Sequence, residues 1–368
     1  MSTDRAERSG APARVMVDAT GLGTLGSDID SDLIELVKAA GRVRDDIVVV
    51  CKPRDAKLFK SFDLDVHRAP DSVKSERSRR WWIDWSLPKL ARSVGADVIH
   101  SPHGYFPAFT RLGRVVAVRW GTGASDRLRR ILPTFKVDVT VPSTAIGEEL
   151  RAIAGLPANR VHRAPLGVDK DRTSIPDWEA IQAAGDLYGV SEWVVVIGTD
   201  SRLDDLTAFR DGFRQATEFS GLRPTLIVLG VSERKALAVF TDMIDVGFDI
   251  RIVSGIANDE RSAVIGGSIL TVVTDDSDAT GRALIDVMAC GATTLAIQNP
   301  ALVEIGGEAV DFADATPAAM EIALTGLLKN EERRRELATA AVTRSHRFSW
   351  EQSLVAHRAA WARAAARL

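Results

Sequence analysis

The sequence has few cysteines, no long apolar run and no excess of basic charge, and each absence narrows the function. Two cysteines in 368 residues, Cys51 and Cys290, lie far apart inside apolar runs, so buried free thiols are favoured over a disulfide. No window approaches the roughly 18 uninterrupted apolar residues of a membrane span. The formal net charge of -3 supplies no global basic field that would draw the chain to nucleic acid.

The first residues and the thiols bear on where the protein works. Residues 1–13 are polar and lack the apolar core of a signal peptide, so we read them as a frayed start. With buried thiols, this predicts a cytoplasmic protein. One stretch leaves a peripheral contact at the inner membrane face open, although a helix with a solvated basic side and a buried aromatic side is favoured. It contains Arg77, Arg79, Arg80, Trp81, Trp82 and Trp85.

The length and the alternation of short β-branched runs with amphipathic stretches predict two α/β domains. We expect two facing Rossmann-like domains with parallel sheets and an interdomain cleft. The expected strands are Val15–Asp18, Ile47–Cys51, Val98–His100, Val115–Val118, Val137–Val141, Trp193–Ile197, Leu226–Leu229, Ile250–Val253, Leu270–Val273 and Thr293–Ile297. The first domain is expected to span residues 1–170 and the second residues 191–350, with a linker at 171–190. A helix at 351–368 can return to the first domain.

Ligands of such sheets bind beyond the carboxyl ends of the strands, where helix N-termini gather. Those N-termini present N–H groups and the positive end of the helix dipole, which suits a phosphate or diphosphate. A cleft between the two sheets is therefore the expected site.

Several segments occur in the order and spacing of one known family. They are Asp97–His103, Val141–Ser143, Asn159–Val161, Leu166–Asp169, Ala289–Gly291 and Arg347–Glu351. Together they resemble the retaining, nucleotide-sugar-dependent glycosyltransferases of the two-Rossmann (GT-B) type, the GT4-like or group 1 family. The resemblance implies transfer of a sugar from a nucleotide diphosphate sugar, held by the second domain, to a sugar, lipid-linked or small-molecule acceptor held by the first. It implies retention of anomeric configuration, with no metal and no cofactor.

The first donor motif departs from the family pattern. Gly198 is present after the first strand of the second series, but Leu203 and Asp204 stand at the family's Arg and Lys positions. A carboxylate about 4 Å from a diphosphate would oppose binding by on the order of several kcal/mol. Arg202 either replaces the lost cation or pairs with Asp204 or Asp205.

The second donor motif is retained in shortened form. Asp278 and Asp286 stand where the family has two glutamates. The resemblance implies that Asp278 contacts the transferred sugar as a catalytic residue and Asp286 the ribose. Gly281 would direct its N–H at the phosphate, and Arg282 would supply charge lost elsewhere. The alternative is a solvated loop at Asp278 and a solvent-facing Asp286.

On the acceptor side, Arg119 and Trp120 stand where the family often has a histidine. Arg119 could meet a phosphate or an acidic acceptor, and Trp120 could stack on a sugar or simply pack. His103 is the remaining imidazole and the second catalytic candidate, unless it is only locally bonded. In the glycine-rich run Gly21–Gly26, Gly26 allows close approach to the donor phosphate.

Three readings of the function follow. The first is an active glycosyltransferase with altered donor preference, supported by the two aspartates and Gly281. The second is a non-catalytic member that acts as a partner or regulator of an active enzyme, supported by the missing Arg and Lys. The third is another enzyme of this architecture, such as a sugar-nucleotide epimerase or a phosphorylase, although no phosphorylase cofactor-lysine motif is present. The sequence does not indicate the base, the sugar, the acceptor or the oligomeric state.

Overall fold

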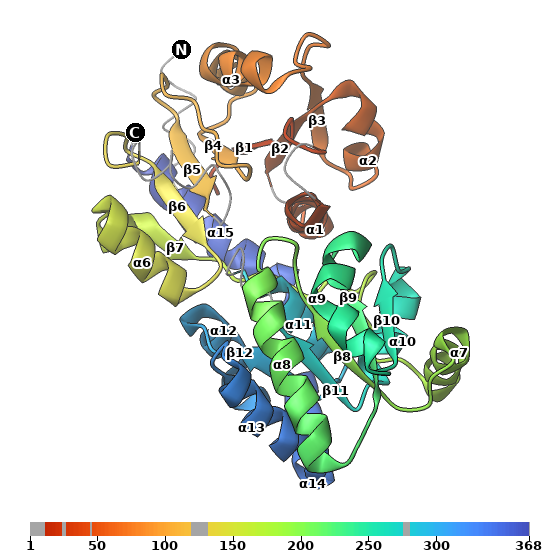
Figure 1. The fold of residues 1–368 in the computed structure, drawn as a ribbon. Helices are drawn as coiled ribbons and strands as arrows, with labels where there is room; N and C mark the ends of the chain where they lie inside the picture. Colours follow the sequence, from red (N-terminus) through yellow and green to blue (C-terminus); the bar gives the residue numbers. More distant parts are fainter. Residues whose placement is uncertain (1–11, 24–26, 45, 119–131, 275–279, 368) are drawn as a thin grey trace. The chain divides into compact units, whose positions relative to one another are not determined.

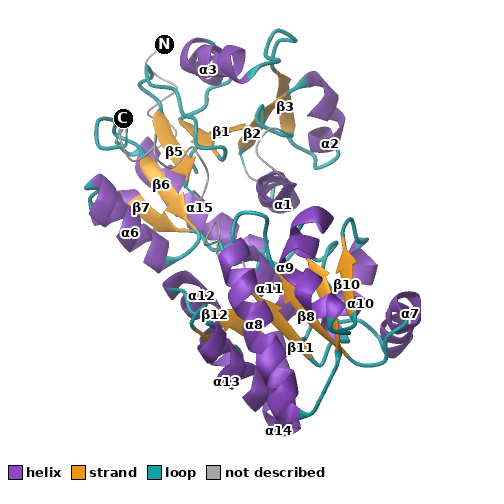
Figure 2. Cartoon of the chain, viewed as in Figure 1, coloured by secondary structure: helices purple, strands orange, loops and turns teal. Residues whose placement is uncertain are grey.

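The computed structural model describes residues 12–23, 27–44, 46–118, 132–274 and 280–367. The chain forms two compact units, Met1–Gly167 with Trp350–Leu368, and Val168–Ser349. Each unit is an open parallel sheet with helices packed on it, as Figures 1 and 2 show. The predicted α/β class with two parallel-sheet domains is therefore confirmed. None of the described helices is both long and apolar enough to cross a membrane.

The sheet of the first unit has seven described strands in the order β3-β2-β1-β4-β5-β6-β7, all parallel. The strands are β1 Val15–Asp18, β2 Ile47–Cys51, β3 Asp65–Arg68, β4 Val98–Ser101, β5 Gly113–Ala117, β6 Asp138–Val141 and β7 Val161–Arg163. The strands β1, β2, β4 and β6 are buried along their length, and β1 and β2 accordingly have near-continuous apolar sequences.

Helices cover both faces of this sheet. They are α1 Ser27–Arg42, α2 Ala56–Lys60, α3 Glu76–Trp85, α4 Leu87–Ser93, α6 Thr144–Ala154 and α15 Trp350–Ala365. On one face, α3 and α4 bury Trp82, Ile83 and Leu87 against Met16 and Ile99 of the sheet. On the other face, α15 packs against α1 and over β4 to β7, so the end of the chain completes the first unit.

The sheet of the second unit has six described strands in the order β10-β9-β8-β11-β12-β13, again all parallel. The strands are β8 Trp193–Ile197, β9 Thr225–Leu229, β10 Ile250–Val253, β11 Leu270–Val273, β12 Thr294–Ile297 and β13 Asp311–Ala313. Its order reverses between β8 and β11, and right-handed crossovers then place the helices that follow these two strands on opposite faces.

The helices of the second unit follow this rule. They are α7 Trp178–Tyr188, α8 Leu203–Ser220, α9 Glu233–Asp245, α10 Asn258–Gly266, α11 Arg282–Ala289, α12 Pro300–Gly306, α13 Pro317–Lys329 and α14 Glu331–Ser345. The helix α8 packs against α9 and α13, whereas α11 packs against α12 and α14. Phe209 and Phe213 of α8 stack at 5.5 Å and are fully buried in the core.

Each strand predicted from the sequence is present to within two residues. The strands β3, β7 and β13, which are short and lie at sheet edges, were not predicted from the sequence. Both cysteines are free and buried, as predicted. Burial raises the pKa of each thiol to about 11, so neither is a reactive thiolate near neutral pH.

Candidate functional site

The candidate donor site lies in the second unit, where the strand order reverses between β8 and β11. In open parallel sheets, loops diverge at such a point and leave room for a ligand beyond the carboxyl ends of the strands. Gly198 follows β8, while Gly281 and the helix α11 follow β11. The sequence-predicted residues Gly198, Arg202, Gly281 and Arg282 therefore all follow these two strands.

Gly198 is a packing glycine at the end of β8. A Cβ at Gly198 would lie 3.1 Å from Val231 and 3.3 Å from Leu206 and Thr274. A Cβ at Gly230 would lie 2.4 Å from the carbonyl oxygen of Gly198. Two glycines thus let the loops after β8 and β9 approach each other closely.

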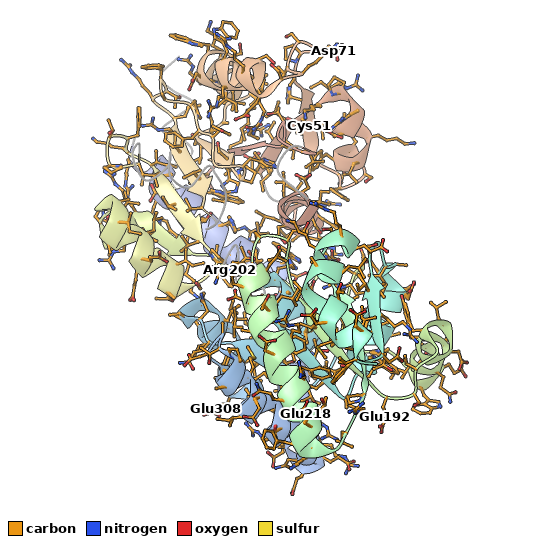
Figure 3. The ribbon with its side chains drawn as sticks, viewed as in Figure 1. Cys51, Asp71, Glu192, Arg202, Glu218 and Glu308 are labelled. Atoms are coloured by element: carbon orange, nitrogen blue, oxygen red, sulfur yellow. The ribbon has the colours of Figure 1, made fainter. Side chains whose placement is uncertain are left out.

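Arg202 is engaged by a carboxylate of its own helix. It is the residue before α8, at the end of that helix labelled in Figure 3. Its Nε donates to Oδ2 of Asp205 over 2.8 Å, and its side chain is 46% exposed. Of the two readings of Arg202, this geometry favours the pairing with Asp205. The acidic first turn of α8, which also contains Asp204, opposes an anion at this helix end.

Gly281 begins α11 under two constraints. Its φ of +68° lies in the left-handed region, which favours glycine. A Cβ at this position would lie only 2.2 Å from Cδ1 of Ile305. The glycine therefore fixes how closely the start of α11 packs on α12, which positions the N-terminal N–H groups of α11.

Asp286 lies between two arginines. It is fully buried on α11, with Oδ1 3.7 Å from Nη1 of Arg282 and Oδ2 3.8 Å from Nε of Arg172. The solvent-facing alternative for Asp286 is therefore wrong, because burial with two cationic neighbours replaces the water it would have met. Two guanidinium groups thus flank one buried carboxylate on α11.

Arg172 was missed by the sequence analysis. It follows the Leu166–Asp169 segment, in a charged run that was read only as a linker. Because its partner Asp286 lies far away in the sequence, only the three-dimensional structure reveals the pair. The segment is tied to α10, since Oγ of Ser262 donates to the carbonyl of Arg172 over 3.4 Å.

In the first unit, polar groups gather after β1, β2 and β4, which are neighbours in the sheet. Buried Asp18, at the end of β1, accepts hydrogen bonds from the hydroxyl of Thr20 over 2.6 Å and from Nη2 of Arg79 over 3.3 Å. Nε of Arg79 also donates to Thr20 Oγ1 over 3.0 Å. A Cβ at Gly21 would lie 2.8 Å from Arg79 and 2.6 Å from the ring of His103, so glycine is needed where these side chains converge.

His103 is a buried histidine held by a carboxylate. Its Nε2 lies 3.3 Å from Oδ1 of Asp30, and Oδ2 of Asp30 accepts from the backbone N–H of Gly23 over 2.7 Å. Partial burial acts to raise the pKa of Asp30, but the bonds from His103 and Gly23 outweigh it and lower that pKa. An ionised Asp30 therefore orients the imidazole of His103. This arrangement fits both a catalytic histidine and a histidine that is only locally bonded.

Four sequence-predicted site residues, Gly26, Arg119, Trp120 and Asp278, lie outside the described residues. The expectation for α3 needs a correction. Arg79 is buried on this helix together with Trp82 and Ile83, whereas Trp81 and Trp85 are more than half exposed. Arg79 can be buried because Asp18 and Thr20 accept hydrogen bonds from its guanidinium. The ring of Trp85 stacks on that of exposed Phe109, with 5.5 Å between the ring centroids.

Two open parallel sheets, each with a strand-order reversal, form the fold that this chain shares with solved glycosyltransferase structures. Residues 33–172 match the family model described as Glycosyltransferase Family 4, and the resemblance to GT4-like group 1 glycosyltransferases is confirmed. A search of curated protein sequences found no match.

Solved structures of similar fold come from several organisms at low sequence identity. A glycosyltransferase from Rickettsia africae has a TM-score of 0.70 at 12% identity, over 94% of this chain and 96% of that one. HepE from Anabaena, solved with UDP-glucose, has a TM-score of 0.70 at 13% identity, over 93% and 97%. The N-terminal domain of a Candida albicans trehalose-6-phosphate phosphatase has a TM-score of 0.68 at 10% identity, over 93% and 95%. At these identities the likeness establishes the fold alone.

Proposed function

We propose that this protein transfers a hexose from a nucleotide diphosphate sugar to an acceptor, with retention of anomeric configuration and without a metal. The observation that carries the proposal is the pair of arginines, Arg172 and Arg282, at the start of α11 beside the reversal point of the second sheet. The structure of Anabaena HepE with UDP-glucose supports the donor class by fold likeness.

The proposed chemistry needs positive charge where the donor diphosphate leaves. The bond between the anomeric carbon and the diphosphate oxygen breaks, a bond to the acceptor oxygen forms, and the acceptor's proton passes to the departing phosphate. Charge that develops on the diphosphate is stabilised by oriented cations and N–H groups. Arg172, Arg282 and the N–H groups that follow Gly281 would serve this role. They would replace the cations that Leu203 and Asp204 do not supply.

Titrations of UDP, GDP and ADP, and of their sugars, test the proposal. We expect at least one diphosphate to bind and its sugar to be slowly hydrolysed, with no loss of rate in EDTA. Arg172→Gln and Arg282→Gln should each weaken binding by about tenfold, the value of one charge-assisted hydrogen bond. Arg214→Gln is the matched control, because Arg214 is exposed on α8 and paired with Glu218.

Two further results would decide the details. The anomeric configuration of the product, read by NMR, tests retention. If no nucleotide diphosphate raises the melting temperature at millimolar concentration, the proposal is wrong. A second candidate, a non-catalytic partner of an active enzyme, is favoured by the Arg202–Asp205 pair and by Asp204 in the first turn of α8. Nucleotide binding without any turnover would support that candidate.

A peripheral membrane contact through α3 is the second part of the proposed function. Exposed Trp81, Trp85 and Phe109 offer aromatic side chains of the kind found at membrane interfaces, and exposed Arg77 supplies positive charge. The chain should sediment with vesicles that contain anionic lipid, and Trp81→Ser with Trp85→Ser should abolish this. Equal sedimentation of wild type and variant would exclude the contact.

A further inference from the structure

A cationic cavity lies in the first unit beside the turn that follows β1. It has a volume of about 100 Å³ and is lined by Lys52, Lys74 and Arg79, with Glu76 and Tyr105. Because one water needs only about 10–15 Å³ by this measure, the cavity has room for several waters or for a tetrahedral oxyanion. Lys52 follows β2, whereas Lys74 and Arg79 flank the start of α3.

The three cations keep hydrogen-bond donors for a ligand. Arg79 is only 4% exposed and uses Nε on Thr20 and one N–H of Nη2 on Asp18, so three of its five N–H donors remain. The ammonium of Lys52 donates to the carbonyl of Leu22 over 3.1 Å and keeps two donors. Lys74 is exposed and forms no ion pair or hydrogen bond with other described side chains.

The one carboxylate in the lining is already engaged. Oε1 of Glu76 accepts from the hydroxyl of Tyr105 over 2.7 Å and lies 3.7 Å from Nε of Arg80. Asp18 is likewise taken by Arg79 and Thr20. The side chains that face the cavity therefore present an excess of positive charge.

The ionisation of Lys52 reflects this crowding. Its pKa is lowered, first because burial removes water and then because Arg54 and Arg79 lie nearby, although Asp55 and Asp30 act in the opposite direction. A bound anion would relieve this repulsion and keep the ammonium charged. The cavity thus has an excess of positive charge that favours an anion. The carboxylates among its described side chains already have hydrogen-bond or ion-pair partners.

The cavity lies close to the acceptor-side candidate His103. Lys52 bonds to Leu22 in the turn after β1, and Arg79 lies against Gly21 in the same turn. The ring of His103 and the guanidinium of Arg79 converge on Gly21, since a Cβ there would lie within 2.8 Å of both. Arg79, which lines the cavity, therefore also lies beside the histidine.

We propose that this cavity binds a phosphate group of the sugar acceptor, so that the acceptor is a phosphate monoester. Three cationic side chains match the charge of a monoester, about -1.5 to -2 near pH 7, better than that of a single carboxylate. This inference rests on the proposed function, because it specifies which acceptor the transferase uses.

Calorimetric titration with inorganic phosphate, at constant ionic strength, tests the site directly. Wild type should bind phosphate, and Lys74→Gln should weaken binding by about tenfold, the value of one charge-assisted contact. Lys52→Gln should weaken it as well. Lys89→Gln is the control, because Lys89 is exposed on α4 outside the cavity, and it should bind like wild type. No binding to wild type, or equal binding by Lys74→Gln and Lys89→Gln, would overturn the proposal.

Titration with UDP in the same samples separates the two proposals. Phosphate binding without UDP binding would support the anion site and refute the transferase function. UDP binding without phosphate binding would support the transferase function and refute the anion site. A hexose should bind more weakly than its phosphate monoester. Competition of phosphate with a soluble hexose phosphate, compared with vesicles carrying a lipid phosphate, then shows whether the acceptor is free or lipid-borne.

Discussion

Gly281 is the residue at which backbone strain and side-chain packing can be separated experimentally. Its left-handed φ would cost an alanine about 1–2 kcal/mol, and the 2.2 Å contact with Ile305 would add about 1–3 kcal/mol of overpacking. We therefore expect Gly281→Ala to lower the free energy of unfolding of the second unit by about 2–5 kcal/mol, as measured by urea denaturation.

Gly221→Ala is the matched control for this prediction. Gly221 ends α8 in the same unit with a φ of +72°, but a Cβ there would meet nothing within 4 Å. Only the backbone cost of about 1–2 kcal/mol should appear. Equal losses in the two variants would show that the contact with Ile305 relaxes without penalty.

At the residue scale, the sequence indicated candidate residues more readily than the side chains that surround them. Spacing singled out Gly198, Gly281 and Asp286 as site candidates, yet it could not indicate that Asp286 is buried between Arg172 and Arg282. Arg79 was read as part of a basic surface, because its partners Asp18 and Thr20 come from a strand end about sixty residues earlier. Such long-range pairs leave no local pattern.

At the scale of elements, α15 makes the first unit sensitive to acid. The ring of His100 on β4 lies 5.3 Å from that of His357 and 5.7 Å from that of Trp361, both on α15. His100 is fully buried, and no described residue hydrogen-bonds either ring nitrogen. Burial, and then the nearby His357 and His103, hold the pKa of His100 well below the usual histidine value of 6.5. Asp32 of α1 faces the same small cavity.

The sign of the pH dependence follows from this depressed pKa. Below about pH 6.5, His100 binds a proton in the unfolded chain but stays neutral in the folded one. The free energy of unfolding is therefore fully present above that pH and decreases as the pH falls. One such group removes about 1 kcal/mol of unfolding free energy between pH 6.5 and 5.5. Urea unfolding of His100→Phe, which keeps an aromatic ring against α15, should lack this part of the loss.

His67→Gln is the control for the acid prediction. His67 lies on the edge strand β3 of the same unit and its side chain is a third exposed. This variant should keep the wild-type dependence on pH. If wild type and His100→Phe lose stability in parallel, protonation of His100 does not govern the docking of α15.

Also at the scale of elements, the missed strands share a physical cause. The edge strands β3 and β7 read Asp-Val-His-Arg and Val-His-Arg, and neither contains a fully buried residue. Central strands are covered on both faces and so read as continuous apolar runs, which the sequence reveals. An edge strand pairs on one side only, and its polar sequence resembles a loop.

At the scale of the whole molecule, each unit has its own sheet and its own buried core. Met16, Trp82 and Ile99 belong to the core of the first unit, and Phe209 and Phe213 to that of the second. The two proposed ligands also divide between the units, since the arginines around Asp286 lie in the second and the cationic cavity in the first. Ligand binding should therefore stabilise the units separately.

Calorimetric melting should accordingly show two transitions. A ligand that binds only the folded state stabilises it by about 2.7 kcal/mol at a concentration 100 times its dissociation constant. UDP should raise the transition of the second unit, and phosphate that of the first. Comparing the fluorescence of Trp82→Phe and Trp193→Phe with that of wild type assigns them, because buried Trp193 belongs to the second unit and buried Trp82 to the first. A single transition raised by either ligand would instead mean that the units unfold cooperatively, so that occupation of one site stabilises the other.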